Sequence, residues 1–218
     1  MPSQLKNLTW IHHASFRLEQ DGFVIYLDPW RIRNAEKKAD LILITHTHPD
    51  HFDLDSIKAI SKSSTVVVGP ADFEGKLDGV KTMKPGDKLT VGPAEIEAVP
   101  SYNIGKLNHP KDKGWLGFLV RLGGETVYHA GDTDLIPEFF GINCSIALIP
   151  VGGTYTMDKN EALEALTKIK ADYFIPMHYG AIVGGGGTGK EFKSLAESKG
   201  IDKVIALEPE EELEAENW

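Results

Sequence analysis

THTHPDHFD, residues 45–53, is the stretch of this sequence that decides the fold. It directly follows a short apolar run, residues 41–44, which predicts a buried strand. Alternate side chains of an extended segment point the same way, so His46 and His48 share one side. Pro49 has a fixed φ and no N–H, so it can end the strand and let the next side chains approach from another direction. The candidate metal ligands of this stretch are His46, His48, Asp50 and His51.

A polar turn after a buried strand is the simpler interpretation of the same stretch. It would leave several polar side chains beside an apolar strand, each needing its own partner, whereas a metal ion satisfies them in one step. Imidazoles and a carboxylate that converge at a strand end suit zinc or a similar divalent ion. We therefore predict a metal site here.

Length and composition limit the class of protein. The chain has 218 residues, of which 41% are hydrophobic, which is enough for one large domain. Its 32 acidic residues exceed its 23 basic ones, and a formal net charge of -9 argues against a protein that grips phosphate backbones. We expect a small-molecule substrate and no nucleic-acid partner. Cys144, the single cysteine, excludes an internal disulfide and a thiolate cluster for the metal.

Targeting signals are missing from the sequence. No apolar run approaches the roughly 18 residues needed to span a bilayer. Residues 1–6 contain no basic region leading into an apolar core, the pattern of a signal peptide. We therefore expect a cytoplasmic protein with no membrane span, and the oligomeric state is left open.

The chain alternates runs of strands with helices. Strands are expected at 5–10, 14–19, 23–27, 41–44, 65–68, within 80–99, and at 115–122, 125–130, 145–151, 173–177 and 204–207. Helices are expected from 54, within 70–77, at 136–140, from Asp158 (in a capping box with Glu161) to about 170, and at 190–199. Two sheets packed together with helices outside, an α/β architecture, are expected in one domain covering residues 1–218. Residues 208–218 form an acidic tail, expected to be mobile or a solvated cap.

Further candidate ligands follow other strands. Asp132 comes after the predicted strand 125–130, and His178 after 173–177. His109 lies in the long irregular segment 100–114. Taken alone, each residue has an ordinary alternative role. Asp132 could be a turn aspartate, His178 a histidine satisfied by hydrogen bonds, and His109 a solvated loop histidine. Beside the cluster of residues 46–51, a ligand role is favoured for Asp132 and His178.

Three more histidines and a glycine-rich loop also need an interpretation. His12 or His13 is placed to line the pocket or orient a ligand, with a buried, hydrogen-bonded histidine as the alternative, and His129 is expected to be structural. Residues 184–190 match most of a phosphate-binding loop, but Glu191 stands where serine or threonine would be needed to hold magnesium. A flexible flap beside the metal pocket is the favoured interpretation of that loop.

Taken together, these residues resemble the metallo-β-lactamase superfamily. Residues 46–51 match its H-x-H-x-D-H signature after a strand, 130–133 look like the segment carrying its bridging aspartate, and 175–180 resemble the segment carrying its last histidine. Residues 10–15 are similar to the W-x-G-H-A/S opening of one branch, although His12 replaces the glycine. That branch includes ascorbate-6-phosphate lactonase-like proteins and the phospholipase D acting on N-acyl phosphatidylethanolamines.

The resemblance implies a four-layer αβ/βα sandwich with a two-metal site at one edge of its sheets. The ligands implied for the first metal are His46, His48 and, less directly, His109; those for the second are Asp50, His51 and His178, with Asp132 bridging. His109 departs from the usual H-x-x-G-H pattern. The strand end at 100–103, where this ligand would otherwise fall, has no histidine.

The chemistry that follows is metal-dependent hydrolysis. We expect two divalent ions, with zinc favoured over iron, manganese or nickel. They would lower the pKa of a bridging water toward about 7, so that the resulting hydroxide attacks an ester, lactone, amide or phosphodiester. Asp50 is expected to orient the nucleophile, and His13, Thr154 and Tyr155 to contact the substrate. The alternatives are a phosphodiesterase or nuclease, and a redox or non-catalytic metal-binding protein.

Overall fold

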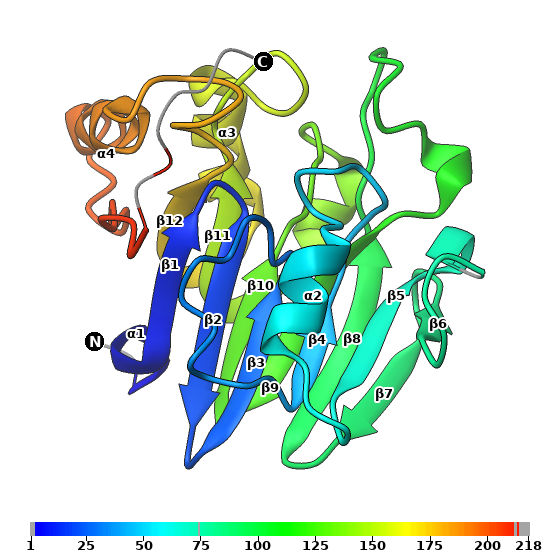
Figure 1. Cartoon of the computed structure of the whole chain (residues 1–218). Coiled ribbons are helices and arrows are strands. Elements are labelled where there is room, and N and C mark those ends of the chain that lie inside the picture. The colour runs from blue at the N-terminus through cyan, green and yellow to red at the C-terminus, as the bar shows by residue number, and fades with distance from the viewer. Residues whose placement is uncertain (1–2, 74, 212, 214–218) are drawn as a thin grey trace.

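Two six-stranded sheets form the centre of the computed structural model, which describes residues 3–73, 75–211 and 213 (Figure 1). The first sheet contains, in spatial order, β1 (Leu8–His12), β2 (Ser15–Gln20), β3 (Phe23–Leu27), β4 (Leu41–Leu43), β5 (Val66–Pro70) and β6 (Lys81–Met83). The second contains β12 (Lys170–Met177), β11 (Asn143–Pro150), β10 (Glu125–His129), β9 (Leu116–Leu122), β8 (Ala94–Pro100) and β7 (Lys88–Val91).

Helices complete the outer layers. The α-helices are α1 (Ser3–Asn7), α2 (Leu54–Ile60), α3 (Lys159–Lys168) and α4 (Thr188–Ser198), and the 3-10 turns are η1 (Ala71–Phe73), η2 (Lys111–Lys113) and η3 (Pro137–Gly141). Helix α2 covers the outer face of the first sheet, whereas α3 and α4 pack beside β12 of the second (Figure 1). The predicted αβ/βα sandwich is confirmed. None of the helices in the described ranges is long and apolar enough to cross a membrane.

The apolar runs of the central strands are buried on both faces. In β3, Ile25 and Leu27 face the core between the sheets, whereas Val24 and Tyr26 join the cluster beneath α2. Strand β4 repeats this division with its three buried residues. Burial on both faces explains why these strands read as continuous rather than alternating hydrophobic segments.

Strand direction brings the polar strand ends to one edge of the sandwich. Strands β3, β4 and β5 are parallel, and β1 runs the same way because β2 is antiparallel to both β1 and β3. In the second sheet β10, β11 and β12 are parallel, and β8 shares their direction through β9. The backbone N–H of Leu116 donates to the carbonyl of Thr45 at 3.0 Å and joins the two sheets at this edge.

Several predicted boundaries are wrong. Residues 5–7 belong to α1 instead of a strand, and the helix expected within 70–77 is only the turn η1, with residue 74 outside the described ranges. The strand expected at 204–207 is reduced to a single bridge between Phe174 and Val204, because the chain then turns away toward β1. The capping box of α3 is confirmed.

The start of the acidic tail packs against β1. The backbone N–H of Glu210 donates to the Trp10 carbonyl at 2.8 Å, and its carboxylate accepts two hydrogen bonds of 2.8 Å from Arg17. The Glu211 carboxylate accepts from the backbone amides of Arg33 and Asn34. These contacts favour a cap over a mobile tail for Glu210 and Glu211, and Glu210 remains exposed to solvent, while 212 and 214–218 lie outside the described residues.

Gly152, just after β11, provides a test of how closely the strand ends pack. A Cβ atom at Gly152 would lie 2.1 Å from the carbonyl oxygen of His178 and 2.6 Å from Val183 Cγ2. We expect Gly152→Ala to destabilise the protein by about 1–3 kcal/mol, because the backbone at His178 must shift. Denaturant unfolding measures this change. Gly185→Ala is the matched control, since nothing lies within 4 Å of its added Cβ, and equal effects of the two substitutions would contradict the close packing.

Candidate metal centre

Three histidines converge at the junction of the two sheets. His46 and His48 follow β4, and His109 comes from the long loop after β8. One ring nitrogen of each lies within 4.8 Å of the others, and Nε2 of His46 is 3.1 Å from Nδ1 of His48. Trp115 packs on both His46 and His48, with ring centroids 4.9 Å from each. The three rings therefore form one group of donors, the first group.

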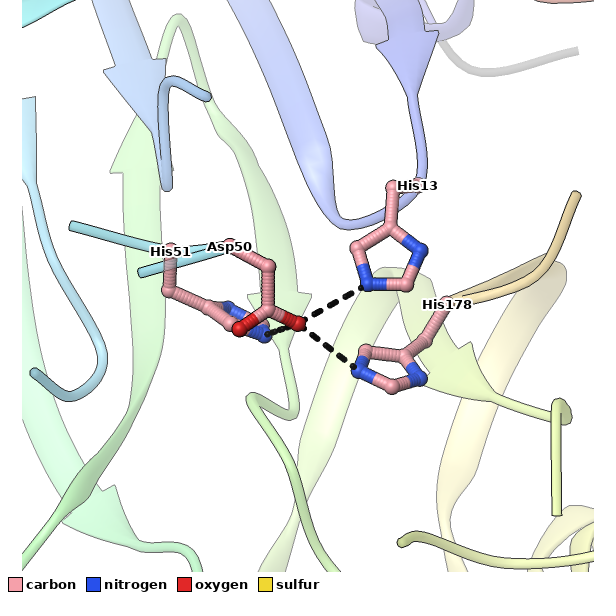
Figure 2. Close-up of side chains that lie close together, drawn as sticks. All are labelled: His13, Asp50, His51 and His178. Atoms are coloured by element: carbon pink, nitrogen blue, oxygen red, sulfur yellow. Dashed lines mark hydrogen bonds and ion pairs between the residues drawn. The ribbon is translucent and has the colours of Figure 1, made fainter. Parts of the chain in front are cut away.

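A second group lies beside the first. Figure 2 shows His13, Asp50, His51 and His178, whose donor atoms all lie within 4.8 Å of one another. Asp50 and His51 belong to the stretch after β4, His13 stands between β1 and β2, and His178 follows β12. Asp50 keeps 16% of its side-chain surface exposed, whereas the three histidines are fully enclosed or nearly so. Asp50 thus faces the mouth of the site.

Asp132 lies between the two groups. Its Oδ2 is 3.2 Å from Nε2 of His109 in the first group and 2.9 Å from Nε2 of His178 in the second. Its Oδ1 is 3.3 Å from Nε2 of His51. One carboxylate therefore contacts both donor groups, the position that a bridging ligand needs.

Asp28, directly after β3, controls the protonation of two rings. It is fully buried and accepts hydrogen bonds from Nδ1 of His51 at 2.6 Å, from the Thr45 hydroxyl at 2.6 Å and from the Thr45 backbone N–H at 2.7 Å. Because the Thr45 hydroxyl donates to Asp28, it accepts from Nδ1 of His46 at 2.9 Å. With protons placed on both Nδ1 atoms, the Nε2 lone pairs of His46 and His51 point into the centre.

Asn103 orients His109 in the same way. Its Oδ1 accepts from the backbone N–H and from Nδ1 of His109, at 3.1 and 2.8 Å, and its amide group donates to Asp134 and to the Tyr155 carbonyl. Lys106 anchors the loop by binding Asp134 and the Thr156 carbonyl. The long segment 100–114 is therefore pinned at its base, and His109 presents Nε2 to Asp132.

Charges in the centre are strongly coupled. Burial alone would lower the pKa of His178, but Asp132 and Asp50 outweigh it and raise that pKa to about 9. Burial is likewise outweighed at His51, whose pKa is raised well above its ordinary value by Asp132 and Asp50. The pKa values of both carboxyls are held far below normal by these histidines despite burial. Without metal, protons on two imidazoles thus balance the two carboxylates.

The centre passes a chemical test for cation binding. Among the described side chains, buried atoms without a hydrogen-bond partner include Nε2 of His51, His109 and His178 and Oδ1 of Asp132. Such atoms are costly to bury unless something satisfies them together. Imidazole nitrogens and carboxylate oxygens are the donors that divalent zinc, iron, manganese and nickel accept. The residues present therefore fit divalent ions of this kind.

The predicted site residues fall into two classes. The structure brings together all seven predicted metal ligands, which are His46, His48, Asp50, His51, His109, Asp132 and His178. It also places His13 in the same cluster. Thr154 and Tyr155 stand outside this cluster. Both residues are exposed. The side-chain amide of Asn103 donates to the Tyr155 carbonyl at 2.9 Å and so links this segment to the loop that carries His109.

Sequence reasoning missed the orienting residues Asp28, Thr45 and Asn103. Asp28 did carry a signal, since it follows an apolar strand just as Asp132 and His178 do. Thr45 and Asn103 also stand at strand ends, but a threonine or asparagine there does not indicate which histidine ring it will contact. His129, expected to be structural, hydrogen-bonds the Ala14 carbonyl at 2.9 Å.

Known proteins share both the sequence and the fold. The family model described as the beta-lactamase superfamily domain matches residues 7–178. A metal-dependent hydrolase of Pyrococcus abyssi is 33% identical, covering 94% of this chain and 97% of its own length. A crystal structure of a candidate metal-dependent hydrolase from Parabacteroides distasonis has a TM-score of 0.83 at 34% identity, covering 93% of both chains. A metallo hydrolase from Ignicoccus hospitalis has a TM-score of 0.75 at 29% identity, covering 94% of this chain and 95% of that chain.

The role of Asp28 can be tested by removing its charge. Asp28→Asn keeps the shape of the side chain but replaces one acceptor oxygen with an NH2 donor. We expect metal affinity to fall about 10- to 100-fold, because the ligand histidines lose their fixed tautomers. Competition with a chromophoric chelator measures the change. Asp53→Asn, at the N-cap of α2, is the control, and equal affinities of the two variants would contradict this role.

Proton release is a second test of the centre. The pKa of His178 is raised to about 9, so its proton must leave before Nε2 can bind an ion. We expect metal affinity to increase as pH rises toward about 9 and then to level off, with protons released on binding at neutral pH. Calorimetry in buffers of different ionisation enthalpy measures the released protons. An affinity independent of pH across this range would contradict the charge balance.

Proposed function

The chain belongs to the beta-lactamase superfamily, and from this premise we propose that it is a metal-dependent hydrolase with a dinuclear centre. The observation that carries the proposal is Asp132, which contacts His109 of one donor group and His178 of the other. Two ions sharing a carboxylate would occupy the two groups. The narrower branch of lactonase-like and phospholipase D-like proteins remains a prediction.

The metal ions are proposed to be zinc, with iron, manganese or nickel as alternatives. The donors are imidazoles and carboxylates, with no thiolate among them, because Cys144 is buried elsewhere. His46, His48 and His109 would hold the first ion, and the second group would hold the other, with Asp132 shared. When bound, two such ions lower the pKa of a water toward about 7 and polarise the bond to be cleaved.

The protein's own residues supply orientation and proton handling. The Asp50 carboxylate faces the mouth, and the neighbouring imidazoles keep it ionised, so it can accept a hydrogen bond from the attacking water and orient it. Asp28 and Asn103 hold the ligand rings in fixed tautomers, so little reorganisation is needed when substrate binds. We keep Thr154 and Tyr155 as substrate contacts at the rim.

The substrate is proposed to be a small molecule with a carbonyl or phosphoryl centre. An ester, lactone, amide or phosphodiester meets this requirement. The net charge of -9 disfavours long polyanions, so a nuclease is the weaker alternative. The loop with Ile104 and Leu107, which are 56% and 94% exposed, stands beside His109 and gives the rim an apolar part.

Hydrolysis by the metal-loaded protein is the direct test. We expect turnover of at least one class in a panel of esters, lactones, amides and phosphodiesters, and loss of turnover on chelation with recovery on metal addition. His48→Ala should lower kcat/KM about 100-fold or more and remove one of two bound ions, because it deletes a donor of the first group. Metal analysis accompanies the kinetics.

Other outcomes would overturn the proposal. Unchanged metal content and hydrolysis in His48→Ala would contradict the assigned centre. A protein that binds two ions but turns over nothing in the panel would be a non-catalytic binding protein. Redox-active iron with oxygen consumption would make it an oxidoreductase.

A further inference from the structure

His13 projects into the second donor group from a separate part of the fold. It lies on the turn between β1 and β2, and its Nε2 is 3.2 Å from Oδ2 of Asp50. Its ring lies against that of His178, with centroids 4.1 Å apart. Figure 2 shows both rings directing a nitrogen toward Asp50 from one side, while His51 approaches from another.

The backbone holds His13 in an uncommon conformation to achieve this. Its φ of 49° lies in the left-handed region that favours glycine. The carbonyl of His13 accepts hydrogen bonds from the Trp10 indole N–H at 3.0 Å and from the His178 backbone N–H at 2.9 Å. His178 has a left-handed φ of 60° as well. Strain of this kind persists where the surrounding contacts enforce it, often at functional sites.

Hydrogen bonding to Asp50 does not account for the arrangement. Nε2 atoms of His13, His51 and His178 lie 3.2, 3.5 and 3.7 Å from the same oxygen, Asp50 Oδ2. A carboxylate oxygen has two lone pairs, so it cannot accept three well-formed hydrogen bonds from these nitrogens at once. Three nitrogens and one oxygen gathered around a common point are the pattern of ligands around an ion.

The environment of His13 keeps it available as a ligand. The residue is only 1% exposed, so its ring is enclosed among the other donors and not turned toward solvent. Imidazole nitrogens are common ligands of divalent ions. The Trp30 ring also packs against His13, with ring centroids 5.3 Å apart.

We propose that His13 is a fourth protein ligand of the second ion, alongside Asp50, His51 and His178, an inference that depends on the proposed dinuclear function. With Asp132 shared, the second position has five protein donors, whereas the first has only His46, His48 and His109 with the same carboxylate. A position with more protein donors is more closed, and one with fewer keeps room for water or substrate. The position in the second donor group is therefore filled before the other. The position in the first donor group is the open one.

Cadmium-113 NMR tests this ligand directly in the unmodified protein. The full-length chain is labelled with nitrogen-15 in its histidines and loaded with cadmium-113. Scalar coupling between metal and nitrogen passes only through a coordinate bond. We expect Nε2 of His13 to couple to the same cadmium as His51 and His178. Coupling from those two histidines but none from His13 would overturn the inference.

A variant pair measures the contribution of His13 to affinity. His13→Gln should weaken binding of the first equivalent of metal by about 10-fold or more. The affinities for the first and second equivalents should then differ less than in the unsubstituted protein. His12→Gln is the matched control, because His12 is the adjacent buried histidine, packs on Trp30 and lies outside both donor groups. Chelator competition gives both affinities, and thermal unfolding checks that the variants fold.

The results separate this inference from the proposed function. If no histidine couples to cadmium, the dinuclear centre itself is wrong. If both ions bind and substrate is hydrolysed, but His13→Gln and His12→Gln have the same affinity as the unsubstituted protein, only the ligand role of His13 is wrong.

Discussion

The buried carboxylate of Asp28 is the interaction on which the centre depends. A fully buried charge is costly unless it is hydrogen-bonded on all sides, and Asp28 is satisfied by Thr45 and His51. These same bonds fix a proton on Nδ1 of His51 and, through the Thr45 hydroxyl, on Nδ1 of His46. The hydrogen bonds that make burial of the charge possible thus also set which ring nitrogens face the centre of the cluster. Asn103 repeats this arrangement for His109 on the other sheet.

The sandwich makes such a centre possible because it brings distant strand ends to one edge. Parallel strands within each sheet end in the same direction, and the bond between Leu116 and Thr45 holds the two edges together. Close approach then limits which residues fit. A side chain at Gly131 would meet the Leu116 carbonyl at 2.7 Å, and its φ of 64° also favours glycine. Asp132 follows this glycine, so the tight turn places between the sheets the carboxylate that contacts both donor groups.

Local patterns of sequence predicted the fold and most of the centre, and contacts between distant segments account for the rest. Strand alternation, the hairpins and the capping box of Asp158 and Glu161 are short-range features, so they could be predicted. Asp132 and His178 could be predicted to join the cluster because each follows an apolar strand and residues 46–51 already suggested a metal site. The function of Thr45 and Asn103 depends on which ring lies opposite, and a single sequence does not contain that information. The contact of Glu210 could not be predicted for the same reason, since its partner Arg17 lies far away in sequence.

The two donor groups differ in a way that bears on reactivity. The first group contains His48, which is partly exposed, and its rings lie against the loop that carries His109. The second is enclosed by His13, His51 and His178, with only Asp50 reaching the mouth. An enclosed group of many donors stabilises an ion and the fold around it, whereas an open group leaves space for exchange. Because Asp132 contacts both groups, an ion held in the enclosed group would also fix the carboxylate that the open group shares. The left-handed turns at His13 and His178 place two of the enclosing rings.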